Sequence, residues 1–237
     1  DGIEHTRATG DFAAGAAMME PAFAIRDRLN AHYAHFIDPL QTNPDRGNVY
    51  NLRRYRASGW YNKYRIWSET IAASAASVAL PREMAVALDT DNLAWTRGWQ
   101  RPEVSVANLE RWDVTMPPDI KYGTQRAPAA FFYRTEVDVP AMFAGKTVAL
   151  FFPSLIARNL RLWVNGTPVT FDHGDYRDDN WRGPAYFWSN YNHTRLFDVT
   201  PSIRPGEKNT IAFRVFKSYD HGGTYDRVFL LANPPKE

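Results

Sequence analysis

Short runs in which apolar and polar residues alternate dominate the chain beyond Pro81. In one run, Val148, Leu150 and Phe152 share a face if the backbone is extended, because successive side chains of a strand point to opposite sides. Turn signals separate the runs, and Asn165-Gly166 is a strong one because both residues accept the backbone conformation of a tight hairpin. Since no helical pattern lies between the runs, the sequence predicts an antiparallel β-sandwich. The expected strands are a leading one from Met84 and then residues 131–139, 146–152, 160–164, 168–171, 195–200, 209–216 and 227–231.

A helical pattern occupies the first 80 residues. Apolar side chains recur at helical spacing in two places, first Ile25, Leu29, Tyr33, Phe36 and Ile37, and then Trp60, Tyr64, Trp67 and Ile71. Pro21 suits the first turn of the first helix, and Asp38-Pro39 should end it. We expect the two helices to bury little against each other and to pack on the β domain or on a neighbour.

These patterns predict two regions. Residues 1–80 are interpreted as a helical and irregular N-terminal segment, either separate or the tail of a preceding domain. Residues 81–237 are interpreted as the sandwich. The Ala- and Ser-rich residues 72–79 between them are expected to be a helix end or a linker.

Composition and charge narrow the classes of partner. The 237 residues carry a formal net charge of +2, and no run of Lys or Arg exceeds two, so the pattern of a nucleic-acid-binding protein is absent. No apolar run is long enough to span a bilayer. Cysteine is absent, which excludes disulfides and thiolate metal sites and suits a cytoplasmic or an exported protein. Because the chain opens with Asp1, we expect a processed or trimmed chain or a fragment, in which any signal peptide would be invisible.

Five motifs follow one another in a fixed order through the sandwich region. In that order they resemble the N-terminal sugar-binding domain of family 2 glycoside hydrolases, which belongs to the galactose-binding-like jelly rolls. The motifs are Leu80-Pro81 with Trp99 and Trp112-Asp113-Val114-Thr115-Met116-Pro117, Phe132-Tyr133-Arg134, Leu162-Trp163-Val164-Asn165-Gly166, Phe197-Asp198-Val199-Thr200 with Pro205-Gly206 and Asn209, and Gly222-Gly223-Thr224-Tyr225.

The resemblance implies a galactose-binding-like jelly roll that does not itself catalyse hydrolysis. Family 2 enzymes carry two catalytic glutamates, one of them after an asparagine, on a separate barrel domain. This chain has no Asn-Glu pair, and the length outside the sandwich region is too short for a (β/α)₈ barrel. The resemblance also implies an acidic sugar contact near Tyr225-Asp226-Arg227-Val228, which makes Asp226 a candidate although the acidic and basic residues stand in reversed order here.

A ring-rich insertion between Asp175 and His193 is the main candidate for ligand binding. Flat aromatic faces suit the apolar face of a pyranose, and neighbouring Asp, Asn and Arg side chains can hydrogen-bond its hydroxyls. The same rings could instead seal one end of the sandwich or form an interface. A second loop that contains His221 could rim the binding face. The predicted carbohydrate-binding residues are Tyr176, Asp178, Asp179, Trp181, Arg182, Tyr186, Trp188, Asn192, His221 and Asp226.

The sequence supports a metal or cofactor site less than it supports a carbohydrate-binding site. Structural Ca²⁺ is an alternative for the acidic set, but the spacing of an EF-hand is missing, so solvated loops are favoured. Three loop histidines do not show the converging arrangement of a zinc site. No cofactor is expected. The acidic set is Asp172, Asp175, Asp178, Asp179 and Asp198, and the histidines are His173, His193 and His221.

We therefore predict a noncatalytic carbohydrate-binding or accessory domain of a glycoside hydrolase-like protein, located in the periplasm or outside the cell. It would bind a glycan or oligosaccharide, or complete the active site of a neighbouring catalytic domain or second copy. Two alternatives stay open. One is a structural scaffold without a ligand of its own, and the other is a small glycan-acting hydrolase or lyase that uses the loop histidines with carboxylates.

Overall fold

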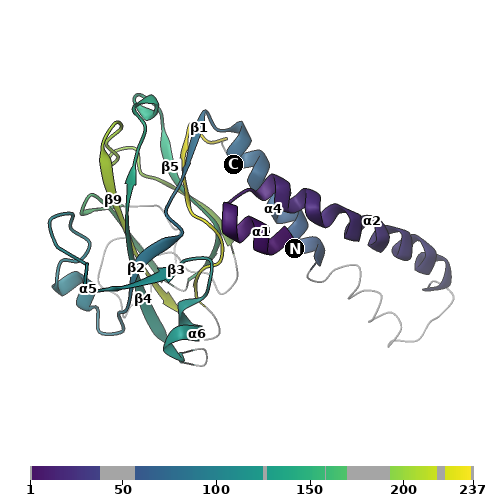
Figure 1. Ribbon diagram of the computed structural model, residues 1–237, viewed down its shortest axis with the longest axis horizontal. Helices are drawn as coiled ribbons and strands as arrows, with labels where there is room; N and C mark the ends of the chain where they lie inside the picture. The colour runs from purple at the N-terminus through teal and green to yellow at the C-terminus, as the bar shows by residue number, and fades with distance from the viewer. Residues whose placement is uncertain are drawn as a thin grey trace, which may run out of the picture. The chain divides into compact units, whose positions relative to one another are not determined.

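Two compact units make up the chain, residues 1–72 and residues 73–237. The computed structural model describes residues 2–37, 57–124, 127–157, 159–169, 193–217 and 222–235 (Figure 1). The first unit is helical and the second is built mainly of strands. No helix in the described ranges is long and apolar enough to cross a membrane.

The helical unit contains α1 (Gly2–Thr9), α2 (Phe12–Ile37) and α4 (Ala57–Ala73). Helix α2 begins nine residues before the predicted start at Pro21, because the alanine-rich stretch that precedes the proline favours helix strongly enough to accommodate it. Ile25, which was expected on the buried face, is 51% exposed.

The expectation that the two helices bury little against each other is wrong. The Phe12 ring lies 5.5 Å from Tyr64 and 5.3 Å from Trp67, measured between ring centroids. The rings of Phe23 and Tyr61 stack at 4.4 Å. Aromatic contacts of this kind stabilise a helix pair beyond the area that they bury, so α2 and α4 share an aromatic interface.

The second unit consists of two antiparallel sheets, which confirms the predicted β-sandwich with a helical segment before it (Figure 1). In the five-stranded sheet, β1 pairs with β11, β11 pairs with β5, and β5 also pairs with β8 and β10. The order in the six-stranded sheet is β3-β2-β4-β9-β6-β7. The strands are β1 (Ala76–Ala79), β2 (Glu83–Leu88), β3 (Glu110–Asp113), β4 (Ala129–Asp138), β5 (Val148–Ile156), β6 (Asn159–Val164), β7 (Thr167–Pro168), β8 (His193–Asp198), β9 (Lys208–Lys217), β10 (Gly223–Thr224) and β11 (Phe229–Ala232).

Strand β1 was not predicted, because its residues were interpreted as a helix end or a linker. Ala76 pairs with Ala232 and Ala79 with Phe229, so the first strand of the sandwich lies before Pro81. Alanine and serine favour strands weakly. The pairing with β11, which is remote in sequence, therefore determines the conformation of these residues.

The core lies between the two sheets and follows the alternation seen in the sequence. Phe213 on β9 stacks on Tyr133 of β4 at 4.6 Å and meets Phe152 of β5 edge-on at 5.2 Å. All three side chains are fully buried. Because Phe213 belongs to one sheet and Phe152 to the other, this contact joins the two layers.

The outer face of the six-stranded sheet is covered by residues 89–109, which we call the 89–109 excursion. It carries the short helix α5 (Leu93–Thr96) and packs Ala94 and Trp99 against Phe132 and Trp163 of the sheet. Apolar side chains on both faces of strands β4 and β6 are therefore buried, which explains the nearly continuous apolar sequence of β4.

Two buried arginines hold the excursion on the sheet. Arg214 and Asp89 form an ion pair with 2.7 Å between Nε and Oδ2, and their side chains are 2% and 0% exposed. Arg134 donates to the carbonyl oxygens of Trp99 at 3.0 Å and Pro102 at 3.1 Å. Arg134 belongs to one of the sequence motifs, and its role in the structure is to anchor this excursion.

Two motif asparagines also have structural roles. Asn165 and Gly166, with φ of 51° and 79°, form the tight turn between β6 and β7 that the sequence predicted. The Asn165 amide donates to the Asn209 side-chain oxygen at 2.8 Å and accepts from the Thr210 backbone at 2.9 Å. Asn209 is fully buried and donates to the Arg204 carbonyl at 2.8 Å. The pair ties this hairpin to the turn before β9.

Candidate functional site

Most of the predicted binding residues lie outside the described residues. These are Tyr176, Asp178, Asp179, Trp181, Arg182, Tyr186, Trp188, Asn192 and His221. Of the ten candidates, the structure describes Asp226, and its side chain is 1% exposed.

Asp226 lies in a turn that is fastened to both sheets. β10, just before it, pairs with the end of β5, where Thr224 is opposite Leu155. The Thr224 hydroxyl donates to the carbonyl of Val114 at 2.6 Å. After Asp226, Arg227 donates to the Leu80 carbonyl at 2.8 Å. Arg227 thus binds the backbone just before Pro81. The Thr224 and Arg227 hydrogen bonds hold the turn on both sides of Asp226.

A group of polar side chains lies beside this turn, and we call it the Tyr133 cluster: the buried Tyr133 and Asp119 with the half-buried Tyr122 and Tyr225. Asp119 is fully buried on the short helix α6 (Pro118–Tyr122). Burial raises the pKa of the Tyr133 phenol well above its ordinary value, and the nearby charges of Tyr225, Asp119 and Tyr122 add to the rise. The Tyr133 hydroxyl has no hydrogen-bond partner within the described part of the chain.

Tyr122 is half-buried and lies at the edge of the Tyr133 cluster. Burial, together with the Glu110 carboxylate, which accepts from the phenol at 3.2 Å, raises the pKa of Tyr122 to about 12. The cluster therefore contains phenols that keep their protons at neutral pH and can donate hydrogen bonds. Tyr133 and Asp119 are sealed from solvent, so their present role is to fix the end of the sandwich.

The sequence did not reveal this cluster. In the sequence, Tyr133 has the pattern of an ordinary core residue on a strand, and Asp119 that of a charged residue in a long loop. Only the pairing of β10 with β5 brings Tyr225 to the other members, and no local pattern signals that pairing.

Gly223 is required at its position beside the Tyr133 cluster. Its φ is +116°, and a Cβ there would lie 2.5 Å from the Tyr133 hydroxyl oxygen and 3.1 Å from Pro118. We expect Gly223→Ala to lower the free energy of unfolding by about 2–4 kcal/mol, from backbone strain and overpacking together. Urea denaturation followed by circular dichroism measures the change.

A matched glycine separates the two causes. Gly145 has φ of +71°, and no atom of the described residues lies within 4 Å of the added Cβ, so Gly145→Ala should cost only about 1 kcal/mol. Adding Tyr133→Phe to Gly223→Ala should recover part of the loss, because it removes the clashing oxygen. Equal losses for the two single glycine variants would contradict this account of Gly223.

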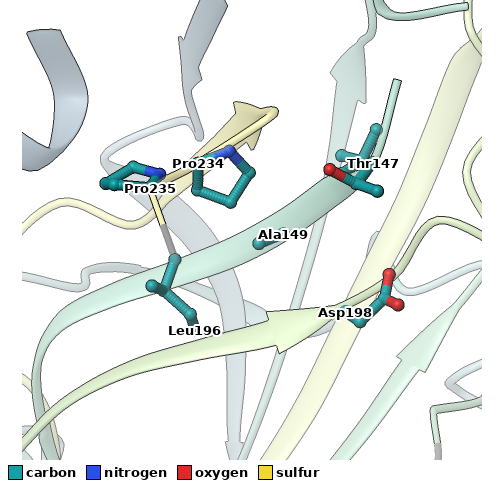
Figure 2. Close-up of a pocket in the computed structure, with 7 residues that line it drawn as sticks. Thr147, Ala149, Leu196, Asp198, Pro234 and Pro235 are labelled. Atoms are coloured by element: carbon teal, nitrogen blue, oxygen red, sulfur yellow. The ribbon is translucent and has the colours of Figure 1, made fainter. Parts of the chain in front are cut away.

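A pocket of about 300 Å³ lies elsewhere, on the five-stranded sheet (Figure 2). In Figure 2 the rings of Pro234 and Pro235 lie on one side of β5, and Leu196 and Asp198 of β8 lie on the other. One oxygen of the Asp198 carboxylate accepts from the Thr200 backbone at 2.9 Å. The pocket is at the small end of the range for ligand sites. Its described lining contains no aromatic ring, so it lacks the flat face expected of a sugar site.

The acidic and histidine sets do not form a metal site in the described ranges, where no group of three potential ligands occurs. Asp198, at the end of β8, is exposed. His193 begins β8, and its side chain lies outside the described ones. The remaining members, Asp172, His173, Asp175, Asp178, Asp179 and His221, fall outside the described residues.

Solved structures of other proteins share the fold of this chain. The chain aligns with the apo structure of β-glucuronidase from Ruminococcus gnavus at a TM-score of 0.51 and 15% identity, over 67% of this chain and 29% of that one. The complex of the same enzyme with uronic isofagomine gives a TM-score of 0.52 at 15% identity, over 68% and 29%. About two thirds of this chain thus shares its fold with part of the β-glucuronidase chain.

This likeness concerns the fold, because the identity is low. The chain spans about 29% of the length of the β-glucuronidase chains that it matches. No family model matches the sequence, and a search of curated proteins finds no match. The family resemblance drawn from the motifs is thus confirmed at the level of a fold related to glycoside hydrolases.

Proposed function

We propose that this chain is a noncatalytic carbohydrate-binding or accessory domain of a glycoside hydrolase-like protein. The observation that supports it most is the alignment of 67% of this chain with 29% of a β-glucuronidase, an enzyme that hydrolyses a glycoside. A domain of this size within a longer enzyme can bind the substrate while another domain supplies the chemistry. The motif order adds to this support, because it resembles the galactose-binding-like jelly roll of family 2 enzymes.

The ligand in this proposal is a glycan or oligosaccharide held by the ring-rich insertion. Trp181 and Trp188 would stack on pyranose rings, and the polar side chains around them would bind hydroxyls. Direct contact by Asp226 would require its carboxylate to become exposed, since its side chain is 1% exposed. The polar and remaining aromatic members of the site are Tyr176, Asp178, Asp179, Arg182, Tyr186, Asn192 and His221.

Loss of the Trp181 ring tests this assignment. We expect Trp181→Ala to weaken glycan binding by at least about tenfold, as removal of a central aromatic contact commonly does. A glycan array followed by calorimetric titration of the strongest ligand measures the effect. Met142→Ala is the surface control, because Met142 is 58% exposed on the short helix η1 (Ala141–Phe143), away from the insertion in sequence. Identical binding profiles for wild type and Trp181→Ala would remove Trp181 from the site.

The partner and location follow from the same proposal. A glycoside hydrolase catalytic domain, or a second copy of this chain, would lie beside the sandwich and share the glycan. A protein that processes extracellular glycans acts in the periplasm or outside the cell. The absence of cysteine is compatible with that location.

A scaffold role is the second candidate, and exposed apolar side chains near α6 favour it. Met116 and Ile120 are 44% and 49% exposed. Exposed apolar residues that gather on a surface mark contact sites. Light scattering coupled to size-exclusion chromatography separates the two functions, because a monomer that binds glycan supports the binding domain, whereas a stable oligomer without glycan affinity supports the scaffold.

A further inference from the structure

A small residue creates the pocket on the outer face of the five-stranded sheet. Val148 and Leu150 of β5 belong to the core between the sheets, so Ala149 between them faces outward. Ala149 lies opposite Asp198 of β8 on one side and opposite Leu231 of β11 on the other. Because directly opposite residues of antiparallel strands share a face, an alanine methyl lies between two larger side chains. This difference in size leaves a hollow, which is the pocket of about 300 Å³ (Figure 2).

The proline wall of the pocket is held in place by a clasp between Thr147 and Asn233. The Asn233 side-chain oxygen accepts from the Thr147 backbone at 3.0 Å, and the Asn233 backbone donates to the Thr147 carbonyl at 2.7 Å. The clasp fixes the start of the Pro234-Pro235 segment, in which both rings restrict φ. A wall that is fixed before binding loses little conformational entropy when a ligand enters.

The polar groups of the lining are hydrogen-bond acceptors. One oxygen of the Asp198 carboxylate accepts from the Thr200 backbone at 2.9 Å, and no ion pair engages Asp198 within the described part of the chain. The Thr147 hydroxyl donates to the Asn233 side-chain oxygen at 3.2 Å, so its lone pairs can still accept. The backbone N–H of Thr147 is already used, and the prolines have none. A ligand that donates hydrogen bonds therefore suits this lining.

A basic side chain has the chemistry that matches the pocket. Leu196 and the two prolines provide apolar surface for methylene groups, and lysine and arginine bury their stems on such surface while the charged head stays at the rim. Ammonium and guanidinium groups donate and do not accept, which complements a carboxylate and a hydroxyl. An anionic ligand would be repelled by Asp198, whose carboxylate is the charged group among the described lining residues.

We propose that this pocket docks a lysine or arginine side chain of a partner protein. The cation would bind the Asp198 carboxylate and the Thr147 hydroxyl, and the stem would lie over Ala149, between Leu196 and the proline rings. Charge complementarity to Asp198 selects a basic segment as the occupant. The proposal goes beyond glycan binding and holds or fails separately from it, because none of the described lining residues belongs to the predicted glycan site.

The test follows the backbone amides of the isotope-labelled full chain by NMR during titration with small probes. The probes are N-acetyl-arginine amide, N-acetyl-lysine amide and N-acetyl-citrulline amide, the last of which has nearly the shape of the arginine probe without its charge. We expect saturable shifts at Thr147, Ala149 and Leu196 with at least one basic probe. The citrulline probe should bind at least about tenfold more weakly than the arginine probe, because charge-assisted hydrogen bonds are stronger than neutral ones.

Three variants locate the interaction. Asp198→Asn should weaken binding of the basic probes by about tenfold or more, while the amide oxygen can still accept from Thr200 and preserve the turn. Asp138→Asn is the matched control, because Asp138 is also an exposed residue at the end of a strand, in the other sheet, and it should bind as wild type does. Ala149→Val keeps the charge but fills the hollow, and should also weaken binding.

Four results would overturn the inference. The first is the absence of shifts at the lining residues with either basic probe. The second is equal binding of the arginine and citrulline probes, or an equal loss for Asp138→Asn and Asp198→Asn, since either excludes a specific ion pair. The third is tighter binding of D-glucosamine than of both basic probes, which would make the occupant a small amine. The fourth is a wild-type dimer that Asp198→Asn converts to a monomer, which would make the occupant a second copy of this chain.

Discussion

Replacing Arg214 with methionine is expected to lower the free energy of unfolding by about 3–5 kcal/mol, because it leaves the Asp89 carboxylate buried without its cationic partner. Burial lowers the pKa of Arg214, and the hydrogen bond that its guanidinium donates to Asp89 opposes that change. Removing one member of such a pair costs more than the pair itself contributes, since the remaining charge keeps its desolvation penalty. Urea denaturation followed by circular dichroism gives the loss.

Two further variants identify the cause. Asp89→Asn combined with Arg214→Met should recover about 1–2 kcal/mol, because no buried charge remains and an amide oxygen can still accept from Ala94. Lys208→Met removes an exposed pair, with Lys208 and Glu136 side chains 63% and 50% exposed, and should change stability by less than about 1 kcal/mol. A double variant as unstable as Arg214→Met alone would show that the uncompensated carboxylate is not the cause.

Phe213→Ala is expected to lower the free energy of unfolding by about 3–5 kcal/mol, from lost burial and the cavity that remains. The Phe213 ring contacts Tyr133 in its own sheet and Phe152 in the opposite sheet, so its loss weakens the contact between the layers. The same denaturation experiment measures the change.

Phe216 provides the control on the same strand. It lies on the opposite face of β9 and is half-buried, so Phe216→Ala should cost clearly less than Phe213→Ala. Similar losses for the two variants would contradict the placement of Phe213 between the sheets.

Local patterns predicted much of the sandwich. The apolar runs of β4, β5 and β9 are properties of the strands themselves, so the sequence shows them directly. The turn at Asn165-Gly166 was predicted for the same reason, because both residues adopt positive φ. The early start of α2 was missed because a proline was given more weight than the alanines before it.

Features that depend on remote pairing were not predicted. Strand β1 has weak strand formers and exists through its pairing with β11. The Tyr133 cluster requires β10 to pair with β5 and α6 to lie over the same end. The insertion was chosen from composition, which says what a segment can bind but not where its side chains lie.

The central claim is that this sandwich binds glycan without cleaving it, and a proton NMR time course tests both halves together. The chain would be mixed in turn with cellohexaose, xylohexaose and mannohexaose, and saturation transfer and anomeric signals followed over a day. We predict saturation transfer to at least one oligosaccharide, with anomeric intensities unchanged. New reducing-end signals, or no transfer to any of the three, would contradict the account.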